Sequence, residues 1–284
     1  MSALMSEVTR FAPSPTGRLH LGHAYAALFA AEQAGPNGRF LIRMEDIDRS
    51  RCRLEYETAI LEDLAWLGLS WSSPVERQSA HIDDHRWALD KLREADLLYP
   101  CFCTRREISD EVARSERAPH GPEGPLYPGT CRHLTRQERH ERMEEGFSYA
   151  WRLDMSEALK RMAGLTWMDR HAGKQIARPE LLGDVVLARK DISTSYHLSV
   201  VVDDARQGIT LVTRGEDLFM ASHLHRLLQA LLDLPIPEWL HHRLLTDSQG
   251  QRLAKRHDSL SLESLRQAGE TSEELRRRLG FAVS

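Results

Sequence analysis

Two histidines, His20 and His23, stand three residues apart directly after a turn rich in proline. Residues 8–11 predict a short buried strand and residues 21–34 a helix, so both histidines lie where that helix begins. A helix N-terminus offers unpaired backbone N–H groups and a positive dipole end, and Gly22 lets a flat ring approach the backbone. The spacing therefore indicates a nucleotide site, and the alternative is a turn with two incidental surface histidines.

This motif resembles a known family. Residues 20–23 are similar to the His-Ile-Gly-His signature of class I aminoacyl-tRNA synthetases, and residues 11–17 resemble its glutamyl and glutaminyl branch. The resemblance implies that His20, Gly22 and His23 bind ATP with its Mg²⁺. It also implies that the two histidines are catalytic, because they stabilise the phosphorus centre that the amino acid carboxylate attacks.

A second cationic segment lies far downstream, with Arg252, Lys255 and Arg256 in five positions. Alone, such a run more often marks a solvated surface. Following the histidine motif, it resembles the Lys-Met-Ser-Lys-Ser loop of the same class, which implies that Lys255 is the catalytic, ATP-binding lysine. Arg252 and Ala254 depart from that pattern, and Ala254 removes one hydroxyl donor to phosphate.

An amino acid with an acidic side chain carries two carboxylates and one ammonium group, all of which need partners once they leave water. Arg10 and Arg214 stand at strand ends, where α/β ligand sites gather, and arginine forks suit carboxylates. By resemblance both face the substrate side-chain carboxylate, Glu45 meets its ammonium, and Tyr196 borders it. Singly, each is equally consistent with a surface ion pair or a core tyrosine. The glutamate site also includes the turn residues Phe11, Ala12, Pro13 and Ser14.

Three of the four cysteines, Cys101, Cys103 and Cys131, fall in a segment rich in proline and glycine. A Cys-x-Cys pair in an extended strand places both sulfurs on one side. Three thiolates and one further donor complete a tetrahedral zinc site, which a small insertion with little core requires. From the residues alone, His120 and His133 are easier fourth ligands than a tyrosine, and three buried free cysteines are the alternative reading.

The spacing of these cysteines, with Tyr127 four residues before Cys131, is similar to the zinc site of the short glutamyl-Q synthetases. That resemblance implies a structural zinc ion held by Cys101, Cys103, Tyr127 and Cys131. It further implies tRNA-independent activation of L-glutamate with ATP. The acceptor is then the queuosine cyclopentenediol in the anticodon of tRNA(Asp).

The elements that position these residues are strands and helices in alternation. Strands are expected at 8–11, 39–44, 149–153, 185–189, 198–202 and 210–213. Helices are expected at 21–34, 54–67, 80–97, 218–232, 260–267 and 272–279. The expected fold is α/β, a Rossmann-like class I synthetase catalytic domain with an inserted zinc-binding subdomain and a short helical C-terminal tail.

Four regions follow from this division. Residues 1–98 and 181–240 are expected to form the two halves of the catalytic core, and residues 99–180 the inserted zinc-binding subdomain. Residues 241–284 are expected to hold the Lys255 loop and the tail. Fewer than 30 residues follow Arg256, so we expect no anticodon-binding domain.

The bulk properties of the 284 residues restrict the class of protein. No apolar run reaches the roughly 20 residues of a membrane span and no export signal is visible, so we expect a cytoplasmic protein. We also expect a monomer. The net charge of −4 neither demands nor excludes tRNA. The alternatives are a truncated glutamyl-tRNA synthetase that charges the 3′ end of tRNA(Glu), a nucleotidyltransferase of the wider superfamily, and a non-catalytic paralogue.

Overall fold

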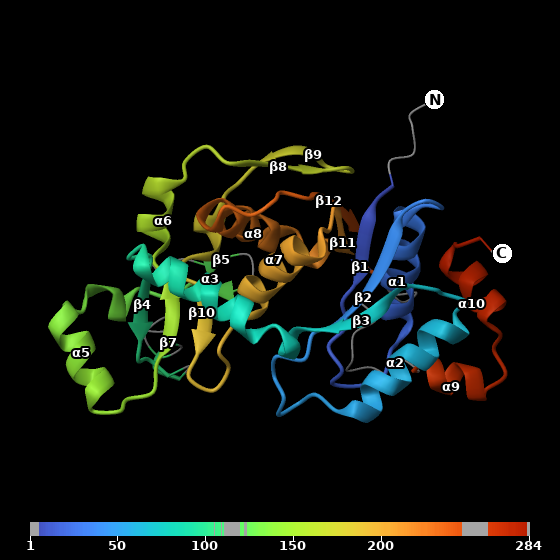
Figure 1. Cartoon of the computed structure of the whole chain (residues 1–284), viewed down its shortest axis with the longest axis horizontal. Coiled ribbons are helices and arrows are strands. Elements are labelled where there is room, and N and C mark those ends of the chain that lie inside the picture. The colour runs from blue at the N-terminus through green and yellow to red at the C-terminus, as the bar shows by residue number, and fades with distance from the viewer. Residues whose placement is uncertain are drawn as a thin grey trace.

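The computed structural model describes residues 6–104, 106–108, 110, 120–121, 124–245 and 261–282. It shows an elongated α/β molecule whose two described ends lie at the same end of the long axis (Figure 1). In this part of the chain, no helix combines the length and the apolar character that a bilayer span needs.

The N-terminal half is built on a parallel sheet of order β1-β2-β3, made of Val8–Phe11, Arg39–Met44 and Ser72–Arg77. Helices α1 (Leu21–Ala34) and α2 (Leu54–Trp66) contribute buried residues to the same apolar core. The chain turns so tightly between α1 and β2 that a side chain does not fit at Gly38. A Cβ atom there would lie 1.9 Å from the backbone oxygen of Ala34.

A second sheet, of order β11-β12-β8-β9, continues beside the first. Its strands are β8 (Thr166–Asp169), β9 (Gly173–Ile176), β11 (Leu211–Gly215) and β12 (Glu238–His242). The backbone N–H of Thr210 donates to the Val8 oxygen at 3.0 Å, which places β11 beside β1. The C-terminal ends of β1 and β11 therefore meet, although the chain between them contains almost 200 residues.

The centre of the molecule is formed by α3 (Ile82–Glu94), α7 (Tyr196–Gln207) and α8 (Phe219–Leu232). Their apolar faces share one core with the antiparallel sheet β10-β7-β4. That sheet lies at the far end of the long axis from α1 and α2 (Figure 1). Its strands and the flanking helices are β4 (Leu98–Cys101), β7 (Ala150–Leu153), β10 (Val186–Arg189), α5 (Arg136–Glu144) and α6 (Met155–Arg161).

The C-terminal helices α9 (Leu262–Gln267) and α10 (Ser272–Leu279) pack on the core of the N-terminal half. The remaining described elements are short. They are the 3₁₀ turns Gln78–Ala80, Thr130–His133, Pro179–Leu182 and Glu216–Leu218, and the two-residue strands β5 (His120–Gly121) and β6 (Gly124–Pro125).

One expected strand is wrong. Residues 198–202, which include three consecutive valines, lie in helix α7, and the helix buries residues 198–204 without a break. A continuous apolar run has no period that separates strand from helix. The deciding features are local, because the Ser195 side chain accepts from the Leu198 N–H and Gly208 ends the helix at a φ of 66°.

Candidate active site

The two histidines of the sequence motif begin α1 as expected. His20 is the N-cap, and its Nδ1 accepts the Gly22 N–H at 3.1 Å, while His23 Nδ1 accepts the His20 N–H at 3.3 Å. The rings stack with centroids 3.8 Å apart. Because both Nδ1 atoms accept hydrogen bonds, the neutral form of each ring carries its hydrogen on Nε2. The pair thus places two imidazole rings at a helix N-terminus, a location that favours a phosphate group.

A cavity of about 450 Å³ opens where β1, β11 and the start of α1 meet. Most of the residues expected at the amino acid site line it, together with His23 from the nucleotide motif. They are Arg10, Phe11, Ala12, Ser14, Glu45, Tyr196 and Arg214. The structure thus brings the expected carboxylate and ammonium partners together from four separate segments of the chain.

Arg10 is held by a carboxylate. Its Nε and Nη2 donate to the two oxygens of Asp204 at 2.9 and 3.2 Å, and its Nη1 donates to the Thr213 backbone oxygen. Arg43 Nη1 donates to the same carboxylate at 2.7 Å. All three side chains are buried, so Asp204 carries the counter-charge for two arginines. Burial alone would raise the pKa of Asp204, but Arg10 and Arg43 lower it overall.

Arg214 is held differently. Its Nε donates to His241 Nε2 at 3.2 Å, its Nη1 to His225 Nδ1 at 3.1 Å, and its Nη2 to the Ser222 hydroxyl. Arg214 as a residue is 6% exposed. Among the described residues, none of the ion pairs within 4.0 Å includes Arg214. A buried cation without a contacting carboxylate is a strong site for an anionic ligand.

Glu45 and Tyr196 complete the polar lining. Burial raises the pKa of Glu45 to about 7, although Arg43 and Arg10 oppose that shift. The Glu45 N–H donates to the Pro13 backbone oxygen at 2.9 Å, which fixes the turn after β1 against the end of β2. Tyr196 is the first residue of α7, and burial raises the pKa of its hydroxyl.

Three expected residues do not line the cavity in the part of the chain that the structure describes. Pro13 acts through its backbone, and His20 and Gly22 form the helix cap beside it. Lys255, with Arg252 and Ala254, lies outside the described residues. The described chain resumes at Ser261, which forms a backbone bridge with His20.

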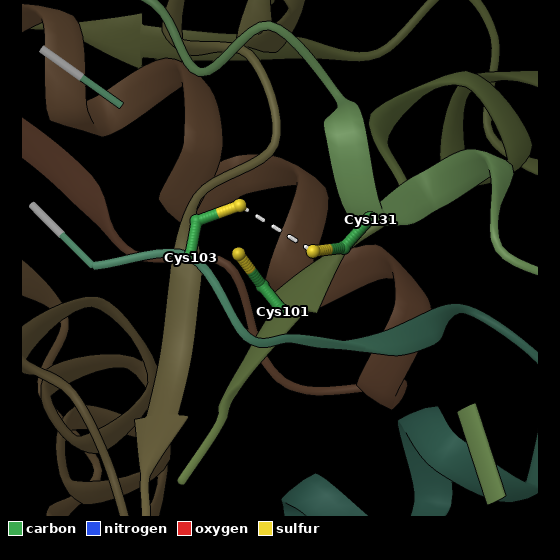
Figure 2. A group of neighbouring side chains, drawn as sticks. All are labelled: Cys101, Cys103 and Cys131. Carbon is green, nitrogen blue, oxygen red and sulfur yellow. Dashed lines mark hydrogen bonds between the residues drawn. The ribbon is translucent and has the colours of Figure 1, made fainter. Parts of the chain in front are cut away.

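The three cysteines of the central segment converge as expected (Figure 2). Cys101 ends β4 and Cys131 lies in the turn Thr130–His133. The Cys103 and Cys131 sulfurs are 3.4 Å apart, and all three sulfurs lie within 4.8 Å of one another. The Tyr127 hydroxyl accepts the Cys131 N–H at 2.8 Å and lies 3.6 Å from the Cys103 sulfur.

This arrangement fits a tetrahedral metal site. Thiolates bind zinc at about 2.3 Å, so ligating sulfurs lie roughly 3.8 Å apart. Hydrogen bonds from Cys101 and from the Phe102 N–H lower the pKa of Cys131 to about 6, although burial opposes the shift. Among the described residues the metal-type cluster contains these cysteines and does not include His133. The His120 side chain lies outside the described part.

Several buried residues around the arginines were missed by the sequence analysis. Asp204 lies two residues after the apolar run 198–202 that was expected to be a strand, and the consecutive acids Asp203 and Asp204 are the local signal for buried charge. His225 lies three residues after Ser222 on α8, and that spacing is a detectable signal for a shared helical face. His241 has no local signal, because it meets Arg214 only through the pairing of β11 with β12.

Comparison with known proteins agrees with this geometry. Residues 7–283 match the family model for the catalytic domain of class I tRNA synthetases (E and Q). The glutamyl-Q tRNA(Asp) synthetase of Rhodobacter capsulatus is 47% identical over 280 residues, which cover 96% of this chain and all of that protein. The glutamate–tRNA ligase of Aquifex aeolicus is 39% identical over 275 residues, which cover 95% of this chain and 56% of the ligase.

The similar solved structures are also glutamate–tRNA ligases. A glutamate–tRNA ligase from Elizabethkingia meningosepticum, in complex with its amino acid, matches with a TM-score of 0.72 and 27% identity. The match covers 93% of this chain and 53% of the ligase, so the chain spans about half the length of the glutamate–tRNA ligases it matches. The chain therefore belongs to the class I tRNA synthetases of the glutamate and glutamine type, through their catalytic domain.

Proposed function

We propose that this chain activates L-glutamate with ATP and Mg²⁺ to glutamyl-adenylate without tRNA, and then transfers the glutamate to the queuosine cyclopentenediol in the anticodon of tRNA(Asp). The observation that carries the first half is the cavity that gathers Arg10, Arg214 and Glu45 beside His23. The second half is supported by the similarity to synthetases named for glutamyl-Q tRNA(Asp).

The charges of the cavity favour one orientation of glutamate. The side-chain carboxylate meets the guanidinium of Arg214, with Arg10 beside it, and the ammonium group meets Glu45. The α-carboxylate then points to the start of α1. One of its oxygens attacks the α-phosphorus of ATP, the bond to pyrophosphate breaks, and Mg²⁺ pyrophosphate leaves. The Nε2–H groups of His20 and His23 stabilise the charge on the phosphoryl oxygens.

The second step consumes the adenylate. A hydroxyl of the cyclopentenediol attacks the activated carbonyl carbon, the bond from that carbon to AMP breaks, the hydroxyl proton passes to the departing AMP, and the new ester carries the glutamate. Lys255 belongs to the first step in this proposal, where its charge follows the leaving pyrophosphate. The chain returns to His20 at Ser261, six residues after Lys255, which supports this assignment.

Pyrophosphate exchange tests the first half. Purified protein with ATP, Mg²⁺ and labelled pyrophosphate should incorporate label into ATP only when glutamate is added, with no tRNA present. Replacing Arg214 by alanine should reduce kcat/KM for glutamate about 100-fold or more, since it removes a buried ionic partner. Exchange that is independent of glutamate would refute the proposal.

Periodate treatment tests the acceptor. It should be applied to tRNA(Asp) that contains queuosine, in one sample before glutamylation and in another after it, with tRNA(Asp) lacking queuosine as the control. Labelled glutamate should attach only to tRNA that contains queuosine, and periodate should destroy the free diol of queuosine before the reaction but leave the finished ester. A second candidate, charging of the 3′ end of tRNA(Glu), is favoured by the match to glutamate–tRNA ligases. Labelling of tRNA(Glu) that depends on an intact 3′ ribose would select that candidate.

The three cysteines Cys101, Cys103 and Cys131 form a thiol cluster, which has a structural role in this proposal. Cys101, Cys103 and Cys131, with the Tyr127 hydroxyl, leave a zinc ion no open coordination position for substrate. When bound, the ion supplies a cross-link within the region of residues 99–180. The proposed organisation keeps the catalytic core in residues 1–98 and 181–240, with the Lys255 loop and helical tail in residues 241–284.

A further inference from the structure

Among the described residues, the groups that hydrogen-bond the Arg214 guanidinium are uncharged, and they include the Tyr196 hydroxyl in the cavity. Three buried side chains accept its hydrogen bonds: Ser222, His225 and His241. Arg10, in the same cavity, is instead forked on the carboxylate of Asp204. We call these three uncharged acceptors of Arg214 the neutral clamp; Asp169 lies behind His241 and outside the clamp.

Four elements bring Arg214, the clamp and Asp169 together. Arg214 and His241 are register partners on the parallel strands β11 and β12, so their side chains lie side by side on one face of the sheet. Ser222 and His225 are three residues apart on α8 and share the helical face that meets this sheet. Asp169 ends β8, the next strand after β12, and its Oδ2 lies 2.6 Å from His241 Nδ1.

The hydrogen bonds fix the proton positions. Arginine has only donors, so His241 Nε2 and His225 Nδ1 must both be unprotonated acceptors. His241 therefore carries its hydrogen on Nδ1 and donates it to Asp169, whose other oxygen accepts two backbone N–H groups. His225 carries its hydrogen on Nε2 and donates it to His197 Nδ1 at 3.2 Å. The hydrogen bonds to Asp169 and His197 thus keep unprotonated the two histidine nitrogens that face Arg214.

Electrostatics agree with this assignment. Burial first, and the charge of Arg214 second, lower the pKa of His241 and of His197 to about 4 and that of His225 well below its ordinary value. All three rings are neutral at physiological pH. The guanidinium of Arg214 remains charged, and the carboxylate of a ligand is the first direct counter-charge that it meets.

We propose that the neutral clamp positions Arg214 and keeps its charge uncompensated, and that this makes the cavity select a carboxylate side chain over an amide of the same shape. An amide ligand leaves the buried guanidinium without an ionic partner, which is costly. A protein carboxylate in the clamp would remove that penalty and would also compete with the substrate for the fork. This inference rests on the proposed binding of glutamate at Arg214.

A matched pair of variants tests the inference. Both His225→Asn and His225→Asp keep an acceptor oxygen near the position of Nδ1, and only the second adds a charge. The readout is pyrophosphate exchange with glutamate and with glutamine, measured as kcat/KM for each, with KM for ATP as a control. His225→Asp should lower the glutamate-to-glutamine ratio about tenfold or more, whereas His225→Asn should stay within about threefold of the wild type. Equal ratios in the two variants would overturn the inference.

A further variant keeps the inference testable if the two His225 variants do not fold. Asp169→Asn presents an amide donor to His241 Nδ1, which moves the imidazole hydrogen to Nε2, where it faces the Arg214 Nε–H. KM for glutamate should rise about tenfold or more while KM for ATP stays close to the wild type. An unchanged KM for glutamate would contradict the clamp. If the wild-type protein shows no exchange with glutamate, the proposed function fails, whereas an active wild type with indistinguishable variants refutes the clamp alone.

Discussion

At the scale of single residues, the cavity separates its charges by burial and by partner. Glu45 is the acidic group that faces the proposed ammonium position, and burial raises its pKa to about 7. Asp204 is also buried, but its pKa is lowered overall because two arginines contact it. The role of Glu45 is therefore tested by ligand binding, and the role of Asp204 by the stability of the fold.

Glutamate affinity should depend on the ionisation of Glu45. A carboxyl group with a pKa of about 7 is about nine-tenths protonated at pH 6 and about one-tenth protonated at pH 8. Only the ionised form attracts an ammonium group, so KM for glutamate should fall up to about tenfold as the pH rises from 6 to 8. Glu45→Gln should raise KM and remove this slope. Persistence of the slope in that variant would assign it to another group.

Loss of the Asp204 charge should destabilise the fold. Asp204→Asn leaves Arg10 and Arg43 buried without their shared counter-charge, which costs about 3–5 kcal/mol. Urea unfolding followed by circular dichroism measures the change. Asp83→Asn is the matched control, because Asp83 pairs with Arg86 on an exposed surface and its removal should leave the midpoint unchanged. Similar midpoints for the two variants would mean that Asp204 is not the shared counter-ion.

At the scale of elements, the thiol cluster joins a strand end to a turn more than 25 residues away. Cys103→Ser should reduce bound zinc from about one equivalent per chain to a small fraction, because three thiolates and one phenol leave no spare ligand. Metal analysis of dialysed protein provides the measurement. Cys52→Ser is the control, since Cys52 lies outside the cluster and should leave the zinc content unchanged. A Cys103→Ser protein that keeps its metal would refute the site.

Helix α7 ends at a residue that requires a left-handed backbone. Gly208 has a φ of 66°, and space around it is open, so a side chain there meets strain and no clash. Gly208→Ala should cost about 1 kcal/mol in the free energy of unfolding, and Gly208→Asn should cost less because asparagine tolerates this conformation. The difference between the two variants, measured by urea unfolding, isolates the backbone effect. Equal losses in the two variants would contradict a backbone origin of the effect.

Much of this element pattern could be predicted, and the exceptions have physical causes. The first strand and the first helix have the expected bounds because turn and cap residues flank them. The sulfur cluster and the lining of the cavity were predictable because their residues stand in short motifs. Helix α7 was not, since its apolar run is buried on several sides. The Arg214 clamp was beyond prediction because strand pairing, which no local pattern encodes, brings His241 and Asp169 to it.

At the scale of the whole molecule, the site lies across the junction of the two sheets. Asp204 on α7 contacts arginines from β1 and β2, and Arg170 joins Glu7 to Glu238 across the same junction. Glutamate would contact Glu45 and Arg214, which come from opposite sides of it. Ligand binding should therefore stabilise the two halves together.

Thermal unfolding should show this coupling as one transition. Glutamate at about 100 times its Kd should add about 2.7 kcal/mol to the stability of the folded protein and raise Tm, because it binds only the folded state. Arg214→Ala should abolish the shift with glutamate while keeping the shift with ATP. Two separate transitions, with only one of them responsive to glutamate, would contradict coupling between the halves.

The backbone bridge between His20 and Ser261 attaches the C-terminal helices to the N-terminal core directly after the segment 246–260. Leu245 packs against the N-terminal core before the segment 246–260, and Leu262, Leu265, Leu275 and Leu279 are buried in the same core after it. The two flanks are thus pieces of one interior and do not depend on the intervening peptide bonds for their attachment. A single protease cut between 245 and 261 should leave two fragments that migrate together on a sizing column and separate only in denaturant, and synthetic α9–α10 peptide should reassociate with the larger fragment.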